Sequence, residues 1–356
     1  MKTRAAVLYQ LNKPLRIEEL TIPDLQPGQV LVEVAFSGVC HSQLLEVRGK
    51  RGEDRFLPHL LGHEGSGVVV EVGSQVSKVE KGDKVVLTWI KGLGADCAGA
   101  RYHRGDLTIN SGAITTFSDC TVVSENRCVK LPDGIPMDVA SLFGCAVLTG
   151  AGIVLNTIRP ARENSMVIWG VGGIGLSALM AARLCECSTI IAVDTLDSKL
   201  TLAKKFGATH LINAKAEDAL GRIRQIVGEP GVDFAVEASG HAGIIEQAFQ
   251  SVHKGGGLCV FASHPPAGEK ICLDPHDLIS GKQIRGSWGG ESQPDGDIPR
   301  FAALYRQGKL PLEKLITHRY PLEQINRALD DLEEGKVGRA LIAMARTENG
   351  ASDDRK

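Results

Sequence analysis

Short runs of β-branched residues, separated by turn-forming residues, fill the first 130 positions of the chain. Clear examples are the valine-rich runs at 30–34, 67–72 and 84–87, and Gly, Pro and Asp mark the turns between them. Such runs are typical of strands, because branched side chains pack well on a pleated surface and turn residues end the pairing. The pattern predicts a small β-barrel-like unit.

From about residue 137, helical segments alternate with short apolar strands. The strands are expected at 166–169, 190–193, 210–212, 234–237 and 257–261. Strands that alternate with helices favour a doubly wound parallel sheet, because parallel neighbours need a crossover connection. The alternation stops after about Gly286.

The last part of the chain predicts helices at 300–307 and 323–334, a strand at 340–343 and a polar, frayed end at 348–356. The simplest architecture is an α/β protein in which a β-rich domain is interrupted in sequence by a parallel-sheet domain. A length of 356 residues is enough for two such domains.

A glycine turn joins the first parallel strand to the helix that follows it. The strand at 166–169 continues into Gly170-Val171-Gly172-Gly173-Ile174-Gly175, and the next strand ends at Asp194, 19 residues after Gly175. Gly170 allows the tight turn, Gly172 lets backbone approach a pyrophosphate, and Gly175 lets the helix pack on the sheet. The helix N-terminus then offers free N–H groups to phosphates. This order indicates a dinucleotide site rather than an ordinary strand–turn–helix.

Asp194 also bears on which dinucleotide is bound. A carboxylate there accepts hydrogen bonds from two ribose hydroxyls but repels a 2′-phosphate. No arginine follows it in residues 195–199. NAD is therefore favoured over NADP.

Composition and charge exclude several other classes of protein. Lys and Arg number 40 against 42 Asp and Glu, which gives a net charge of −2, so neither nucleic acid nor a membrane surface is implied as a partner. No apolar run reaches the length of a membrane span, and the first residues lack a signal-peptide core. The 9 cysteines, an odd number spread along the chain, suit a reducing cytoplasm rather than a disulfide framework.

Three short segments carry candidate metal ligands. They contain Cys40, the pair His63 and Glu64, and Cys145. Two thiolates, an imidazole and a carboxylate suit Zn²⁺, and three protein ligands with an open fourth position describe a catalytic zinc. Spacing alone does not join segments so far apart, and each residue taken singly is also explained as a core or capping residue.

Over residues 2–345 the chain resembles the zinc-dependent alcohol dehydrogenases of the medium-chain dehydrogenase/reductase superfamily. The matching segments are Gly38-Val39-Cys40-His41-Ser42; Gly62-His63-Glu64 with Gly67 and Val68; residues 82–85; Cys145 with Thr149-Gly150; the glycine turn with Asp194 and Lys199; and residues 237–240 and 315–318. The resemblance implies a GroES-like β-barrel catalytic domain, residues 1–147 and 288–356, and a Rossmann NAD-binding domain, residues 148–287.

The resemblance also implies roles for individual residues. Cys40, His63 and Cys145 would hold one catalytic zinc, with Glu64 as a nearby or intermittent fourth ligand. Ser42 would take the proton of an alcohol whose oxygen the zinc polarises, while hydride passes to the nicotinamide. Cofactor contacts would come from His41 at the pyrophosphate, Thr149 at the nicotinamide, Lys199 at the adenosine ribose, Arg339 at the phosphates, and Gly170, Gly172, Gly173, Ile174, Gly175 and Asp194.

Two positions near Cys40 depart from the family pattern. Leu45 stands where many relatives carry a histidine that passes the proton to solvent. The proton must therefore leave by another route, such as the ribose or His41. Gln43 stands where an aspartate often supports the zinc-bound histidine, and it supplies a hydrogen bond without a charge.

The loop at 91–115 is a larger departure. Many relatives carry four cysteines in this lobe for a structural zinc, whereas here only Cys97 and His103 have suitable side chains, apart from the less suitable Asp96 and Asp106. Closed structural sites need four ligands. We therefore predict that the structural zinc is absent and that the loop is ordered by other means or is mobile. Trp89, just before this loop, is placed to line the substrate pocket, although an aromatic residue there also suits a core.

The sequence thus predicts a cytoplasmic, zinc- and NAD-dependent alcohol or polyol dehydrogenase that forms an aldehyde or ketone. Its partner would be a small alcohol or carbonyl compound, and its assembly a homodimer or homotetramer. One alternative is a zinc-free NAD(P)H-dependent reductase of the same superfamily. The presence of all four candidate donors, Cys40, His63, Glu64 and Cys145, argues against this alternative. The other is a non-catalytic dinucleotide-binding relative.

Overall fold

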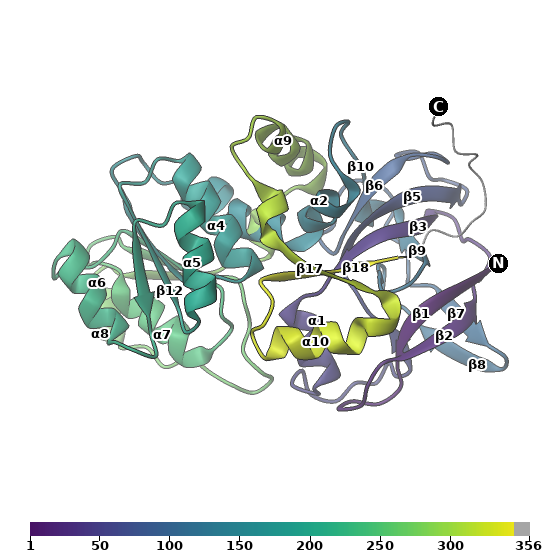
Figure 1. Cartoon of the computed structure of the whole chain (residues 1–356), viewed down its shortest axis with the longest axis horizontal. Coiled ribbons are helices and arrows are strands. Elements are labelled where there is room, and N and C mark those ends of the chain that lie inside the picture. Colours follow the sequence, from purple (N-terminus) through teal and green to yellow (C-terminus); the bar gives the residue numbers. More distant parts are fainter. Residues whose placement is uncertain (345–356) are drawn as a thin grey trace.

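The computed structural model describes residues 1–344, so the polar end expected at 348–356 lies outside the described residues. Figure 1 shows the parallel sheet and its helices, in teal and green, at one end of the molecule, and the β-rich part at the other. The strands nearest the C-terminal end of the described chain return to the β-rich part. The predicted α/β class, with one unit interrupting the other in sequence, is confirmed.

The β-rich part consists of a closed barrel and a seven-stranded sheet. The barrel follows the order β1 (Lys2–Leu8), β2 (Arg16–Thr21), β7 (Arg101–Arg104), β8 (Leu107–Asn110) and β4 (His59–Leu60). The sheet follows the order β10 (Cys128–Lys130), β6 (Lys84–Thr88), β5 (Glu64–Val72), β3 (Gln29–Gly38), β18 (Arg339–Ala343) and β17 (Ile316–Pro321), with β9 (Cys120–Ser124) also paired to β3.

The pairing of β3 with β18 joins two distant parts of the chain. The two strands are antiparallel, and Leu341 lies opposite Gly38. Because β3 ends beside the start of β18, the segment that carries Cys40 and the segment that carries Arg339 become neighbours. This pairing positions much of the site described below.

The second sheet is parallel and has six strands. Its order is β13 (His210–Asn213), β12 (Thr189–Asp194), β11 (Ser165–Trp169), β14 (Phe234–Glu237), β15 (Leu258–Phe261) and β16 (Gln283–Gly286). Met166 and Ile168 of β11 pack into one core cluster, and Val167 and Trp169 into another on the opposite face. A strand buried on both faces reads as a continuous apolar run, which explains why the sequence predicts it.

Helices cover both faces of this sheet and fill the space between the two parts. Those of the parallel part are α4 (Gly173–Leu184), α5 (Asp197–Phe206), α6 (Ala219–Val227), α7 (Ala242–Ser251) and α8 (Pro275–Ile279). Those of the remainder are α1 (His41–Val47), α2 (Met137–Leu142), α3 (Leu148–Gly152), α9 (Pro294–Arg306) and α10 (Ile325–Glu333).

Helix α2 runs through a π-helical turn into α3, and the helical segment spans Met137–Ile158. It is 22 residues long and apolar enough to cross a membrane by length and composition, so the expectation that no apolar run reaches that length was wrong. Its most apolar window is 89% buried in the protein, as in the core helix of a soluble protein.

Several elements differ from the sequence-based expectation. The edge strands β16 and β17 were not predicted, because their sequences, QIRG and ITHRYP, contain no apolar run. The helix expected at 300–307 begins earlier, at Pro294. Proline fits the first helical turn, where its missing N–H would have no partner.

Candidate metal and dinucleotide site

Three side chains from distant segments meet between the two parts of the molecule. Cys40 caps the N-terminus of α1, His63 lies just before β5, and Cys145 lies in the π-helical turn after α2. Their ligand atoms all lie within 4.8 Å of one another. The fold therefore brings together the three residues that spacing alone could not connect.

The chemistry of this group fits a zinc ion. The Nε2 atom of His63 is buried and has no hydrogen-bond partner among the described residues. Such an orphaned polar atom is costly unless a ligand satisfies it. Two thiols and an imidazole with one open side are the donors of a catalytic zinc site.

The His63 ring is oriented through its other nitrogen. Ser42 Oγ lies 3.2 Å from Nδ1, and the side-chain amide of Gln43 contacts the same nitrogen. The Gln43 oxygen accepts a hydrogen bond from the backbone N–H of Cys40 at 3.0 Å. Gln43 thus couples the first two donor segments, where the sequence led us to expect only support for the histidine.

The two thiols share a buried environment. The hydrogen bond from Cys145 lowers the pKa of Cys40 well below its ordinary value, against the effect of burial and with help from His63 and Arg339. The same hydrogen bond, together with burial, raises the pKa of Cys145. The side chains of Trp89 and Thr149 lie beside Cys145, and their hydrogen bonds act to lower the pKa of Cys145.

Glu64 lies next to this group but is not one of the three donors that meet. Its side chain is fully buried and forms an ion pair with Arg339, which is also buried. Small neighbours make room for it, because a Cβ atom at Gly38 would lie 2.1 Å from Glu64 Oε1 and one at Gly144 would lie 2.7 Å from Glu64 Cβ. From the sequence we expected Glu64 to be a nearby or intermittent metal ligand and Arg339 to contact the cofactor phosphates.

The glycine turn follows β11 and forms the predicted start of α4. Gly170 has φ of +82°, in the left-handed region that favours glycine. A Cβ at Gly175 would lie 2.0 Å from the Gly170 carbonyl oxygen, whereas one at Gly172 would meet nothing within 4 Å. Gly175 is therefore required by packing, and Gly172 faces open space from which a ligand can approach.

Asp194 lies at the carboxyl end of β12, next to this turn. Its Oδ2 accepts from the Val171 N–H at 2.9 Å, and its Oδ1 accepts from the N–H groups of Thr195 and Leu196 at 2.8 and 3.1 Å. These bonds fix the carboxylate at the edge where ligands of parallel sheets bind.

Cationic groups gather near the same edge. The pKa of His41 is lowered, first by desolvation and then by the charges of Lys199, Arg339 and His241, while Cys40 opposes the shift. Arg339 also approaches the start of α4, since a Cβ at Gly173 would lie 3.3 Å from its guanidinium. His41, Lys199 and Arg339, predicted separately as cofactor contacts, are thus brought together.

The loop at 91–115 is held by protein groups. Glu125 accepts hydrogen bonds from the N–H groups of Ala95, Ser77 and Lys78 at 2.7, 2.7 and 2.8 Å. The Cys97 thiol donates to the Pro27 carbonyl at 3.1 Å. Within residues 1–344, neither Cys97 nor His103 belongs to a group of potential metal ligands.

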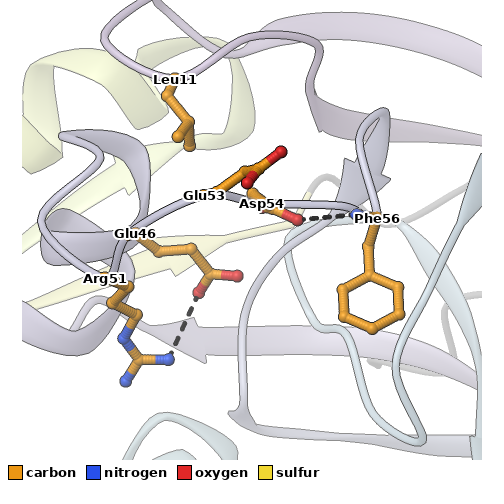
Figure 2. A pocket seen from close by; sticks show the side chains of 7 residues that line it. Leu11, Glu46, Arg51, Glu53, Asp54 and Phe56 are labelled. Atoms are coloured by element: carbon orange, nitrogen blue, oxygen red, sulfur yellow. Dashed lines mark hydrogen bonds and ion pairs between the residues drawn. The ribbon is translucent and has the colours of Figure 1, made fainter. Parts of the chain in front are cut away.

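A second group of potential ligands, which the sequence did not suggest, lies beside a surface pocket. It consists of Glu46, Asp54 and His59. His59 Nε2 lies 2.7 Å from Asp54, and its Nδ1 lies 2.9 Å from the Leu60 carbonyl. Figure 2 shows the Glu46 carboxylate facing Arg51, and the two groups are 3.8 Å apart. Because these groups satisfy one another, Cys40, His63 and Cys145 are the better metal centre.

Trp89 follows β6 and lies beside Cys145. Its ring meets that of Trp288 edge to face, with centroids 5.0 Å apart. The sequence gave no reason to select Trp288, because the strand before it was not predicted.

Comparison with known proteins finds two family profiles and many full-length relatives. The profile described as "Alcohol dehydrogenase GroES-like domain" matches residues 26–133, and that described as "Zinc-binding dehydrogenase" matches residues 173–306. An S-(hydroxymethyl)glutathione dehydrogenase of Synechocystis sp. is 33% identical, over 96% of this chain and 100% of its own.

Solved structures agree along nearly the whole chain. A Burkholderia ambifaria protein described as an alcohol dehydrogenase zinc-binding domain protein has a TM-score of 0.89 and 33% identity, over 97% of this chain and 100% of its own. The benzyl alcohol dehydrogenase of Acinetobacter calcoaceticus has a TM-score of 0.87 and 32% identity, with the same coverage.

Proposed function

The chain belongs to the zinc-binding alcohol dehydrogenase family, and from that premise we propose that hydride transfer between an alcohol and NAD takes place at Cys40, His63 and Cys145. One observation carries this assignment: three zinc-type donors from distant segments converge, and Ala146, the residue after one of them, lies against Gly173 of the glycine turn. The product is an aldehyde or a ketone.

The zinc would be held by Cys40, His63 and Cys145, where it supplies a Lewis acid for the substrate oxygen. Ser42 Oγ would hold the proton of the alcohol, and its 3.2 Å contact with Nδ1 of His63 would also help to orient the ring whose Nε2 faces the metal. Trp89 would limit access of water on one side. Glu64 would act from beside the donors by neutralising Arg339.

NAD would accept or deliver the hydride, and the chain's own residues would orient it. Asp194 would accept from the ribose hydroxyls, and the N–H groups at the start of α4 would face the pyrophosphate next to Gly172, Gly173 and Ile174. Lys199 would offset the phosphate charge, while His41, whose pKa is lowered, and Arg339, whose charge Glu64 balances, would donate hydrogen bonds to the phosphates. The Thr149 hydroxyl, which is buried beside Cys145, would bond the nicotinamide end.

Four further assignments are also part of this proposal. The zinc count is one per chain, because the loop at 91–115 offers Cys97 and His103 to no metal group within the described residues. The proton leaves through the ribose or His41, since Leu45 cannot carry it. The domain limits are 1–147 with 288–356, and 148–287. The enzyme works in the cytoplasm as a homodimer or homotetramer.

Reduction of NAD⁺ with a panel of primary, secondary, cyclic and sugar alcohols tests the activity. We expect turnover of at least one class, its loss after chelation and its return on adding Zn²⁺. A zinc-free reductase would instead oxidise NADH or NADPH with an activated alkene and tolerate the chelator. A non-catalytic relative would bind NADH without turnover.

A further inference from the structure

A buried carboxyl group lies at the end of a central strand of the parallel sheet. Glu237 is the last residue of β14, and it lies opposite Trp169, the last residue of β11. The glycine turn begins directly after Trp169. Glu237 is therefore placed at the strand ends that border the ligand crevice, yet its side chain is completely buried.

This carboxyl group holds the turn that follows its own strand. Glu237 Oε1 accepts hydrogen bonds from the N–H of Ser239 at 2.6 Å, from the hydroxyl of Ser239, and from the N–H of Gly240 at 3.0 Å. Three donors on one oxygen fix the path of the chain at residues 239 and 240, which we call the Ser239–Gly240 turn.

Hydrogen bonding, rather than a negative charge, is what Glu237 contributes to this turn. Burial raises the pKa of Glu237 more than its three hydrogen bonds lower it. The second carboxyl oxygen, Oε2, is buried without a partner among residues 1–344. An uncharged side chain with an acceptor oxygen in the same place should therefore serve nearly as well.

The Ser239–Gly240 turn lies directly against the glycine turn. A Cβ at Gly170 would lie 2.9 Å from the backbone nitrogen of Ser239 and 3.0 Å from its Cα and Cβ atoms. The N–H of Ala238 also donates to the Trp169 carbonyl at 2.8 Å. Gly170 thus adopts its left-handed conformation in contact with Ser239, and a shift of Ser239 toward it would displace the start of the glycine turn.

The far side of the Ser239–Gly240 turn is closed as well. A Cβ at Gly240 would lie 3.3 Å from Ser263 Cβ and 3.4 Å from the His264 carbonyl oxygen. The segment after His264 bonds the β-rich part, since the Ala267 N–H donates to the Lys50 carbonyl at 2.8 Å. The turn therefore lies between the glycine turn and a segment anchored to the other part of the molecule.

Resting on the proposed function, we propose that Glu237 is a positioning residue for NAD: it holds the Ser239–Gly240 turn so that the glycine turn keeps the shape that receives the pyrophosphate. Glu237 acts through Ser239 and Gly170, because its own carboxyl group is enclosed by protein. Loss of its hydrogen bonds weakens the binding of the cofactor and leaves the reaction of bound cofactor unchanged.

The test replaces Glu237 with two side chains of similar length. Glu237→Gln keeps an acceptor oxygen, whereas Glu237→Met removes it and still fills the space. Ser239→Ala removes one of the three hydrogen bonds from the other end. The control is Asp233→Asn, because Asp233 precedes β14 and bonds Ser165 of β11 at 2.7 Å, so it joins the same two strands at their amino ends.

NADH fluorescence titration and urea unfolding are measured for each protein. We expect the Kd for NADH to rise about ten-fold in Glu237→Met, about two- to three-fold in Ser239→Ala and less than about two-fold in Glu237→Gln. Asp233→Asn should lose stability but keep its Kd. With the best alcohol of the panel, Glu237→Met should raise the KM for NAD⁺ by about ten-fold and leave kcat and the KM for the alcohol unchanged.

An unchanged Kd in Glu237→Met would overturn the inference. Equal weakening in Asp233→Asn would overturn it too, because loosening of the two strands would then be the cause. So would a Glu237→Gln protein that binds NADH as weakly as Glu237→Met, since the acceptor oxygen would not matter. If Glu237→Met does not fold, an unchanged Kd in Ser239→Ala decides against the inference.

These outcomes leave the proposed function intact, because the wild type still binds NADH and oxidises an alcohol. A wild type that does neither would overturn both the inference and the proposed function.

Discussion

Arg339 and Glu64 form an ion pair that is buried beside the metal donors, although the two residues are 275 positions apart in the sequence. The pairing of β3 with both β18 and β5 brings them together. Neither charge is tolerable alone in such a place, because water cannot reach it. The pair therefore links the cofactor side of the site to its metal side.

Breaking this pair should strongly destabilise the protein. Glu64→Gln leaves the Arg339 charge buried without a counter-charge, and we expect the free energy of unfolding in urea to fall by about 3–5 kcal/mol. The double variant with Arg339→Met should recover part of the loss. Glu323→Gln, which removes an exposed partner of Arg4, is the control and should cost less than about 1 kcal/mol. A Glu64→Gln protein as stable as that control would contradict this account.

Two glycines of the turn should respond differently to alanine. At Gly175 a Cβ would lie 2.0 Å from the Gly170 carbonyl, so we expect a loss of about 1–3 kcal/mol in stability and of NADH binding. At Gly172 the Cβ meets no protein atom within 4 Å. Gly172→Ala should keep its stability within about 0.5 kcal/mol, yet bind NADH about ten-fold more weakly because the methyl group blocks the phosphates.

Urea unfolding and NADH fluorescence titration separate these two effects. Unchanged NADH affinity in Gly172→Ala would show that the cofactor does not approach at this glycine.

The carboxylate of Glu125 should make loop stability depend on pH. Burial favours a higher pKa for this group, but the N–H groups of Ala95, Ser77 and Lys78 together hold it below its ordinary value. A carboxylate whose pKa is lowered by folding stabilises the protein at pH values above its pKa in the unfolded chain, near 4.3. This contribution is lost as the pH falls through its pKa in the folded protein.

Glu125→Gln should therefore cost about 1–3 kcal/mol at pH 7, and the difference from the wild type should shrink below about pH 4. Urea unfolding at several pH values measures it. Glu313→Gln, at an exposed carboxylate, should show no such trend. A constant difference across the range would mean that shape rather than charge orders the loop.

The sequence predicted those parts of the fold in which local pattern and burial agree. Strand β11 is apolar on both faces, and the glycine turn after it allows few alternatives, so both were predicted within a residue of their positions. The strands β16 and β17 were missed, because exposed edge strands carry polar residues and have no apolar periodicity.

The candidate site depended on long-range pairing that no local pattern reveals. Cys40 and Cys145 were recognised as candidate zinc ligands, but only the resemblance to a family joined them before the structure did. The same limit explains why Glu64 and Arg339 received separate roles. Trp288 had no signal, since it follows a strand that was itself not predicted.

Zinc content measured beside NADH binding tests the central claim most directly. The wild type and Cys97→Ser should each contain about one zinc per chain, because Cys97 only bonds the Pro27 carbonyl. Cys40→Ser should contain almost none, lose alcohol oxidation and still bind NADH. A Cys40→Ser protein that keeps its zinc and its turnover, or a wild type without zinc that oxidises alcohols, would contradict the assignment of Cys40, His63 and Cys145.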